Sequence, residues 1–265
     1  MTVAILGVGV MGETLLSGLI RGGRPVSDLL VGEKRPERAE QLRTKYGVTV
    51  VSNVEAVRAA DTVALVVKPQ DMADVLAEIS PALDAGTLVV SLAAGITTSF
   101  IEARVPDGVA VVRVMPNTPA LVDEGMHAIS PGTHCDDEHL ATAEALLAST
   151  GKVLRVPENQ QDAVTAISGS GPAYIFFVVE AMIEAGVHLG LPRTTATELV
   201  VQTVAGSGEM LRQTGEHPTV LRERVTSPGG TTAAAIRQLE DHKVRAAFMT
   251  AMEAARDRSR ALSGE

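Results

Sequence analysis

The chain has 265 residues, of which 45% are hydrophobic and 21% charged, which excludes a disordered or collagen-like protein and fits one large or two modest domains. A net charge of −9 argues against nucleic-acid or anionic-membrane partners, and no apolar run reaches the ~18 residues of a membrane helix. The single cysteine, Cys135, rules out an internal disulfide. The apolar start, Val3–Gly12, lacks the pattern of a signal peptide, so we expect a soluble cytoplasmic protein.

Short apolar runs alternate with amphipathic stretches in the first half of the chain. Most runs are continuously apolar, as in strands covered on both faces of a parallel sheet. The alternation predicts an α/β fold with a doubly wound sheet. The predicted strands are Val3–Leu6, Leu29–Gly32, Val48–Val51, Val63–Val67, Leu88–Leu92, Val109–Val114, Met126–Ser130 and Lys152–Val156, and helices are predicted over Glu37–Tyr46, Asp71–Leu83 and Glu138–Ser149.

Helical patterns replace this alternation after Pro157. We therefore predict two domains, residues 1–157 and residues 158–265, the second without strands. Its predicted helices are Tyr174–Leu189, Thr194–Gln213, Thr219–Arg224, Thr232–Leu239 and Val244–Leu262.

The first of these helices is apolar around most of its circumference. Its polar residues Glu180, Glu184 and His188 recur every four positions and form a single stripe. A helix of this kind needs packing partners on several sides. We predict that it lies in a homo-oligomer interface; burial inside one subunit is the alternative.

A glycine-rich loop, Gly7-Val8-Gly9-Val10-Met11-Gly12, follows the first predicted strand. In such a loop the first glycine permits a tight turn, the second lets the backbone approach a pyrophosphate, and the third lets the helix pack on the strand. The start of the next helix then faces the phosphate charge. Because a strand, a helix and a βαβ unit surround the loop, it predicts a dinucleotide site, with a ligand-free turn as the alternative.

The second strand leads into Glu33, where an acidic residue usually accepts from the ribose 2′-hydroxyl of NAD. Lys34 and Arg35 follow at once, and residues 33–45 hold five basic and three acidic side chains. Cations at this position suit the 2′-phosphate of NADP. We predict NADP(H) in preference to NAD(H), although Glu33 leaves NAD(H) open and a solvated helix face would also explain the charges.

Two further loops follow the fourth and fifth predicted strands. The first contains Lys68-Pro69, and the second is Ala93-Ala94-Gly95, whose small side chains allow close approach of the backbone. Ligands of open α/β sheets bind outside the carboxyl ends of the strands. Both loops are therefore expected to contact the cofactor.

The second half contains two glycine-bearing loops, Ser168–Pro172 and Ser227–Thr232, each before a predicted helix. Free backbone N–H groups at a helix N-terminus suit an anion, so the loops predict a small carboxylate substrate; an ordinary helix cap is the alternative. No lysine lies between Lys152 and Lys243 to serve as a general acid. This favours reduction of an imine over a ketone, because a protonated imine needs less proton donation.

The segment His134–His139 carries side chains that resemble a metal cluster. Asp136 or Asp137 also fits a helix N-cap followed by an acidic first turn. We expect a cap here and no metal.

These motifs, in this order, resemble the pyrroline-5-carboxylate reductases over essentially the whole chain. The resemblance implies an N-terminal Rossmann-type doubly wound sheet followed by an all-helical C-terminal dimerisation domain, and homodimers that assemble into decamers in some members. It also implies NAD(P)H-dependent reduction of 1-pyrroline-5-carboxylate to L-proline, the final step of proline biosynthesis. It is carried by Gly7–Gly12, Val67–Pro69, Ala93–Gly95, Met115–Pro119, Ser168–Tyr174 and Leu221–Glu240.

The resemblance further implies which residues contact the two ligands. For the cofactor these are Leu6, Gly7, Val8, Gly9, Val10, Met11, Asn53, Val66, Val67, Lys68, Pro69, Ala93, Ala94 and Gly95, with Lys34 just beyond the second strand; Gly12 and Arg35 join them from the motif and the charge pattern. For the substrate they are Glu158, Arg224, Thr231 and Thr232, with Thr165 and Ser170 near the same pocket.

We expect the backbone N–H groups around Gly230–Thr232 to hold the substrate carboxylate, and Gly229 is also among the expected substrate residues. Thr232 is the expected catalytic residue, with its hydroxyl on the ring nitrogen of the imine. Two alternatives stay open: a reductase of another cyclic imine or of a 2-oxo acid, and a nonenzymatic module that senses a dinucleotide.

Overall fold

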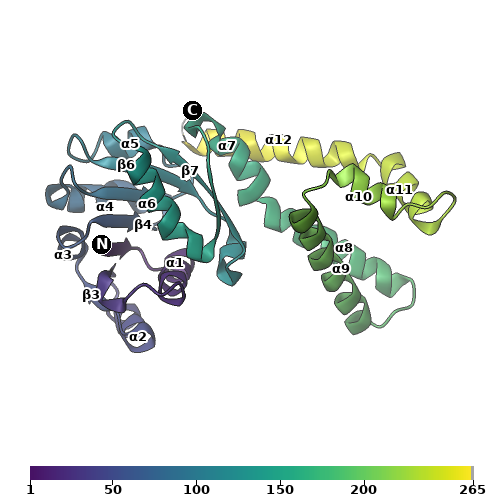
Figure 1. Cartoon of the computed structure of the whole chain (residues 1–265), viewed down its shortest axis with the longest axis horizontal. Helices are drawn as coiled ribbons and strands as arrows, with labels where there is room; N and C mark the ends of the chain where they lie inside the picture. Colours follow the sequence, from purple (N-terminus) through teal and green to yellow (C-terminus); the bar gives the residue numbers. More distant parts are fainter. Residues whose placement is uncertain (264–265) are drawn as a thin grey trace. The chain divides into compact units, whose positions relative to one another are not determined.

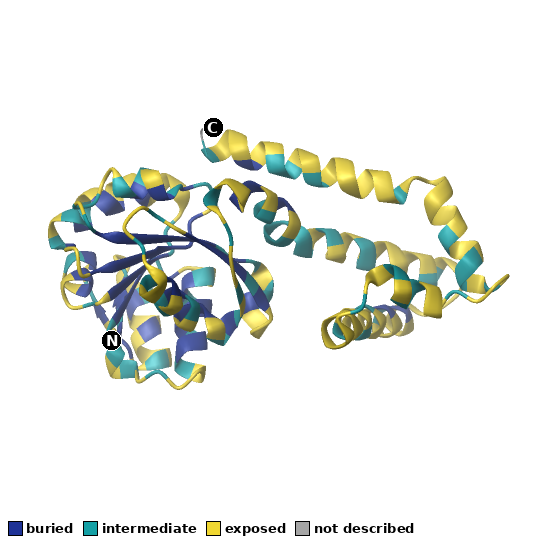
Figure 2. Ribbon diagram, turned by 45° about the horizontal axis from the view of Figure 1, so that its top comes forward, coloured by how far each residue is buried: buried dark blue, intermediate teal, exposed yellow. Residues whose placement is uncertain are grey.

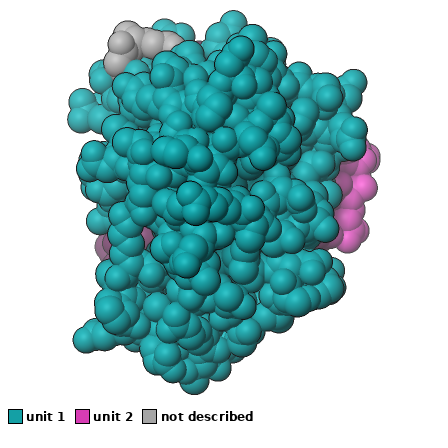
Figure 3. Space-filling view, turned by 90° about the vertical axis from the view of Figure 1, so that its left-hand side faces the viewer, with its two compact units in different colours: residues 1–170, 255–265 teal, residues 171–254 magenta. Residues whose placement is uncertain are grey.

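The computed structural model describes residues 1–263, which form two compact units (Figure 3). Unit 1 comprises Met1–Ser170 and the C-terminal residues from Ala255, and unit 2 comprises Gly171–Ala254. These compact units divide after Ser170 and again before Ala255, and the domain boundary after residue 157 stays a prediction. Residues beyond that boundary pack with the sheet: buried Gln161 donates to the Ala128 carbonyl at 3.2 Å, and Ser259 donates to Asp162 at 2.6 Å.

Unit 1 is built on an eight-stranded sheet of order β3-β2-β1-β4-β5-β6-β7-β8 (Figure 1). Neighbouring strands are parallel except β6 and β7, which are antiparallel. The predicted doubly wound α/β sheet is therefore confirmed. The strands are β1 (Val3–Leu6), β2 (Leu29–Gly32), β3 (Thr49–Val51), β4 (Thr62–Leu65), β5 (Leu88–Ser91), β6 (Ala110–Met115), β7 (Gly125–Pro131) and β8 (Gly151–Arg155).

The helices of unit 1 begin where their sequences supply caps. Asp136 accepts from the backbone N–H groups of Glu138 and His139, both at 2.9 Å, so it is the predicted N-cap. The helix predicted to reach Leu83 ends at Ile79 and continues as a 3₁₀ turn, because Pro81 has no N–H to extend it. The helices are α1 (Val10–Arg21), α2 (Pro36–Tyr46), α3 (Asn53–Arg58), α4 (Met72–Ile79), α5 (Thr98–Glu102), α6 (Asp137–Leu147) and α7 (Gln161–Val164), followed by a π-helical turn (Thr165–Gly169).

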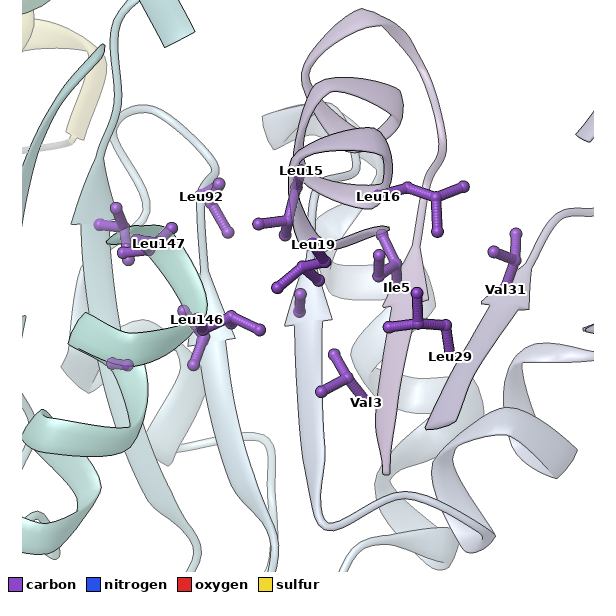
Figure 4. Packing of buried hydrophobic residues seen from close by; sticks show 14 of the residues in the cluster. Val3, Ile5, Leu15, Leu16, Leu19, Leu29, Val31, Leu92, Leu146 and Leu147 are labelled. Atoms are coloured by element: carbon purple, nitrogen blue, oxygen red, sulfur yellow. The ribbon is translucent and has the colours of Figure 1, made fainter. Parts of the chain in front are cut away.

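Two apolar clusters cover the two faces of this sheet. On one face, Leu15, Leu16 and Leu19 of α1 pack over β1 and β2, and Leu146 and Leu147 of α6 belong to the same cluster (Figure 4). On the other face, the cluster draws on α3, α4 and α5. Continuous apolar strands are thus buried on both sides, as their sequences predict.

Unit 2 consists of helices only: α8 (Gly171–His188), α9 (Arg193–Thr214), α10 (Pro218–Arg224), α11 (Thr231–Asp241) and most of α12 (Val244–Ser263). Its helices are mostly exposed or half-buried, in contrast to the sheet (Figure 2). Only Ala196 and Val200 of this unit are buried.

Helix α8 has no buried residue, and its Phe176 and Phe177 are 65% and 72% exposed. Burial of this helix inside one subunit is therefore wrong. By length and composition alone, the helical stretch Glu158–His188 could also cross a membrane: its apolar window has a mean hydropathy of 1.4, and 6% of that window is buried.

Candidate active site

A cleft of 530 Å³ opens in unit 1 beside the carboxyl ends of β1, β2 and β4. The strand order reverses between β1 and β4, which is where open α/β sheets bind nucleotides. Four of the residues that line the cleft were not predicted as cofactor contacts: Gly32, Asp71, Asp74 and Val75. The predicted cofactor residues that line it are Gly7, Gly9, Lys34, Arg35, Asn53, Val66, Val67 and Lys68, together with Glu33.

The three glycines of the first loop have three different surroundings. Gly7 has a φ of +86°, and a Cβ there would lie 2.7 Å from Val67 Cγ1. A Cβ on Gly12 would lie 2.6 Å from the Gly7 carbonyl oxygen, but a Cβ on Gly9 would have nothing within 4 Å. The turn and the close helix packing are confirmed, and the space beside Gly9 is free for a ligand.

Helix α1 begins directly at this space. Its N-cap is Gly9, which has no side chain to accept from the first helical N–H groups. Those groups therefore lack the usual cap, and together with the helix dipole they suit a phosphate.

The cations after β2 are already paired with carboxylates. Arg35 donates to Glu33 from its backbone N–H at 2.9 Å and from two guanidinium nitrogens at 3.0 Å. The Glu33 side chain is 6% exposed, and this burial by itself raises its pKa. The hydrogen bonds from Arg35 lower the pKa by a larger amount, so the net shift is downward. Lys34 Nζ lies 2.8 Å from Glu78 Oε2 on α4.

A second ionic cluster, centred on Glu13, contacts the glycine-rich loop through Arg38. Glu13 of α1 accepts from Lys45 at 2.8 Å, from Tyr46 at 2.7 Å and from Arg38. Arg38 also donates to the Val8 carbonyl at 3.2 Å. The hydrogen bond from Lys45, with those from Arg38 and Tyr46, lowers the pKa of Glu13 to about 2 despite partial burial.

The loops after β4 and β5 lie along the same edge as the glycine-rich loop. Val66 donates its N–H to the Leu6 carbonyl at 2.8 Å, and Leu92 donates to the Leu65 carbonyl at 2.9 Å. These backbone bonds align the starts of the three loops. The cleft is not lined by Pro69 or by Ala93–Gly95. These residues follow β4 and β5, which come next to β1 in the sheet order.

Glu158, an expected substrate residue, is engaged inside unit 1. It accepts from the backbone N–H of Thr98 at 2.8 Å, from the Thr98 hydroxyl, and from Arg113 Nη1 at 3.2 Å. Arg113 lies on β6 and is buried. The carboxylate thus binds the first N–H group of α5, the helix that follows Ala93–Gly95 and whose N-cap is Thr97, and its contact with substrate stays a prediction.

The Ser168–Pro172 loop is tied to the Met115–Pro119 segment. Asn117 donates to the Ser168 carbonyl at 3.1 Å and accepts from the Met126 N–H at 2.8 Å. Thr165 donates its hydroxyl to the Gln161 carbonyl at 2.8 Å. Its carbonyl accepts from the Ser170 N–H at 2.8 Å and closes the π-helical turn, an arrangement often found at functional sites.

The other predicted substrate residues belong to unit 2. Gly229 has a φ of +68°, and Gly230 is the N-cap of α11 without a side-chain cap. The hydroxyls of Thr231 and Thr232, in the first turn, accept or donate no hydrogen bond within residues 1–263. Arg224, at the end of α10, donates to Glu216 at 3.0 Å. This loop offers free N–H groups and hydroxyls to an anion.

Within residues 1–263, no three His, Cys, Asp or Glu side chains are grouped to hold a metal ion. In the His134–His139 segment, Asp136 caps α6, and the Cys135 thiol donates to the Val111 carbonyl at 3.0 Å.

Comparisons with known proteins agree with this arrangement. Residues 158–262 match the sequence profile described as pyrroline-5-carboxylate reductase dimerisation, and residues 2–95 match that of the coenzyme F420-dependent NADP oxidoreductases. Pyrroline-5-carboxylate reductases of Corynebacterium melassecola and Mycobacterium tuberculosis are 47% and 44% identical to the chain; each match covers 98% of this chain and 98% or 96% of the relative.

Two solved structures have the same fold. A pyrroline-5-carboxylate reductase from Coxiella burnetii superposes with a TM-score of 0.94 at 36% identity and covers 98% of both chains. The Plasmodium falciparum pyrroline carboxylate reductase with NADP bound superposes with a TM-score of 0.88 at 30% identity, covering 99% of this chain and 98% of its own. The chain therefore belongs to the pyrroline-5-carboxylate reductase family.

Proposed function

We propose that this chain reduces 1-pyrroline-5-carboxylate to L-proline with NAD(P)H, the last step of proline biosynthesis. The observation that carries the proposal is a pair of helices that begin at glycine N-caps without side-chain caps, α1 at Gly9 and α11 at Gly230. One suits a pyrophosphate and the other a small carboxylate. Both are needed by an enzyme that binds a dinucleotide and a ring acid.

The residues of the cleft fit a nicotinamide dinucleotide. The open space at Gly9 and the first N–H groups of α1 would hold the pyrophosphate, and Asn53 lies beside the ribose end of the cleft. Lys68 and the small residues Ala93–Gly95 would orient the nicotinamide. The bound cofactor supplies a hydride to the imine carbon, and the chain supplies position.

We further propose that NADP(H) is preferred over NAD(H). Lys34 and Arg35 follow β2 on the rim of the cleft, where a 2′-phosphate would lie. The Plasmodium falciparum relative contains NADP. The pairing of both cations with carboxylates leaves NAD(H) as a usable second cofactor.

The substrate carboxylate would bind the N–H groups of Thr231 and Thr232 at the start of α11, because the Gly230 N–H already donates to the Ser227 carbonyl at 3.0 Å. The Thr232 hydroxyl, unpaired within the described residues, would hydrogen-bond the ring nitrogen and orient the imine. A protonated imine already carries the charge that hydride neutralises, so the chain needs no strong general acid. Arg224 of the same unit is a further expected contact of the carboxylate, and Glu158, Thr165 and Ser170 of unit 1 stay predicted substrate residues.

We infer a homodimer formed by unit 2, located in the cytoplasm, with assembly of dimers into a decamer as a further step. The support is the exposed apolar face of α8, which includes Phe176 and Phe177, within the region matching a dimerisation profile. A second copy of the chain would cover this apolar face of α8. The apolar residues of that face also give Glu158–His188 the hydropathy of a membrane-spanning helix. Light scattering of the purified chain gives the stoichiometry, and a monomer that partitions into vesicles would contradict this assignment.

The deciding experiment follows the NAD(P)H absorbance band while 1-pyrroline-5-carboxylate is added with each cofactor in turn. We expect turnover with both and a higher kcat/KM with NADPH. Equal turnover of a six-membered cyclic imine, or of a 2-oxo acid, would support the alternative reductases. Tight cofactor binding with no turnover of any of these substrates would instead indicate a sensing module.

A further inference from the structure

The Lys34 ammonium, expected to receive a 2′-phosphate, is held by a carboxylate of another element. Glu78 of α4 lies 2.8 Å from Lys34 Nζ through its Oε2 atom. The same oxygen accepts from Asn53 Nδ2 at 3.1 Å. Hydrogen bonds from Lys34 and Asn53 hold the pKa of Glu78 below its usual value, so it is a carboxylate at neutral pH.

Asn53 keeps this carboxylate in place. Its side chain is buried against Gly32, where a Cβ would collide with Asn53 Oδ1. Because Asn53 is only 5% exposed, neighbouring atoms confine its amide, which donates to Glu78. Glu78 is 29% exposed, whereas Lys34 is 69% exposed. The carboxylate is therefore the more enclosed partner of the pair, and the ammonium is the one open to solvent and to a ligand.

A 2′-phosphate would have to compete for this lysine. Arg35, the neighbouring cation, is engaged three times by Glu33, and Asp71 and Asp74 add negative charge to the cleft. A phosphate near Lys34 must draw the ammonium from Glu78 or share it, and then meets repulsion from the carboxylate. The 2′-hydroxyl of NADH requires no cation and avoids both costs.

We propose that Glu78 is a specificity-determining residue: by holding Lys34, it weakens the preference for NADPH and keeps NADH usable. This inference rests on the proposed reductase function. Pairs of this exposure contribute modestly, so the expected change on removing Glu78 is roughly three- to tenfold in the NADPH/NADH ratio of kcat/KM.

The test is Glu78→Gln, which keeps an acceptor for Asn53 but removes the charge. We expect the ratio to rise through a lower KM and a lower Kd for NADPH, with NADH nearly unchanged; Kd is measured by quenching of NAD(P)H fluorescence. The matched control is Glu144→Gln, which removes a glutamate paired with Arg155 at 2.6 Å outside the cleft. An unchanged ratio in Glu78→Gln, or an equal rise in Glu144→Gln, overturns the proposal.

If Glu78→Gln does not fold, Lys34→Ala tests the same proposal. Lys34→Ala in the wild-type background should lower NADPH efficiency only about threefold or less, because the ammonium is already occupied. Where Glu78→Gln does fold, the same change in that background should cost more. A loss far above tenfold in Lys34→Ala alone would mean that Lys34 serves the phosphate freely, which overturns the proposal. Absence of wild-type turnover with either cofactor would instead refute the reductase function itself.

Discussion

Glu158 accepts a hydrogen bond from the backbone N–H of Thr98 at 2.8 Å and so joins the start of the dimerisation region to the helix after Ala93–Gly95. Its second partner is the buried Arg113. Within residues 1–263, Glu158 is the only carboxylate that forms an ion pair with Arg113. We infer that Glu158 positions α5 and neutralises Arg113.

Glu158→Gln should therefore lower the free energy of unfolding by about 1–3 kcal/mol, the scale of a charged hydrogen bond weakened in a buried setting. Urea unfolding at one fixed protein concentration measures it. Thr98→Ala removes only the hydroxyl partner and serves as the comparison. If Glu158 acts through α5, both variants alter the KM for the cofactor in the same direction; if only Glu158→Gln raises the KM for the imine, the carboxylate contacts substrate.

The sequence predicted the sheet more accurately than the short helices. The run Val3–Leu6 is a strand from its first to its last residue, because uninterrupted apolar residues next to a glycine turn leave few alternatives. Helices α3 and α5, of six and five residues, are too short to display a 3.6-residue period and were not predicted. The Ser52–Glu55 capping box was the one available signal for α3.

The candidate site, like the fold, could be predicted from the sequence only in part. The roles of Gly7 and Gly12 could be predicted because they follow from local sterics within one βα unit. The engagement of Lys34 by Glu78 could not, because it depends on how α4 packs against α3, which in turn contacts β2. Charge counting found the cations after β2 and the neighbouring Glu33, but not that Glu33 pairs with Arg35 or that Glu78 of α4 pairs with Lys34.

Gly9→Ala should impair cofactor binding without destabilising the fold. A Cβ at Gly9 meets no atom within 4 Å, and its φ of −77° suits alanine, so the free energy of unfolding should stay within about 0.5 kcal/mol. The methyl group would occupy the space of the pyrophosphate, and we expect at least roughly a tenfold rise in cofactor Kd.

The matched comparison is Gly7→Ala. At a φ of +86° and 2.7 Å from Val67, the new methyl group should cost about 1–3 kcal/mol of stability in addition to any loss of binding. Fluorescence titration and thermal unfolding of both variants separate the two effects. Normal NADPH affinity in Gly9→Ala would mean that the cofactor does not cross this loop.

Thr232→Ala should lower kcat/KM for the imine by an amount equivalent to about 1–3 kcal/mol, because a hydrogen bond to the ring nitrogen is lost. Thr232→Ser retains the hydroxyl and should recover most of the activity. Thr203→Ala, which removes a hydroxyl bonded to the Leu199 carbonyl within α9, controls for loss of a helical threonine. Unchanged kcat/KM in Thr232→Ala would remove this hydroxyl from the mechanism.

Glu13 should make the stability of the chain sensitive to acid. Its pKa is lowered from 4.5 to about 2 in the folded chain, so the folded state holds the ionised carboxylate more strongly than the unfolded state does. The contribution is therefore fully present above the unfolded pKa and is lost as the pH falls from 4.5 toward 2. With the side chain 22% exposed, the linkage amounts to roughly 3 kcal/mol at most.

Urea unfolding of the wild type and of Glu13→Gln at neutral pH and near pH 3 tests this linkage. We expect the variant to be less stable at neutral pH, because Arg38 and Lys45 lose their shared carboxylate, and the gap to narrow in acid. Glu37→Gln, in the first turn of α2, changes a carboxylate with no hydrogen bond or ion pair within residues 1–263 and should follow the wild-type pH profile. A gap that stays constant between the two pH values would show that the Glu13 cluster contributes no stability through ionisation.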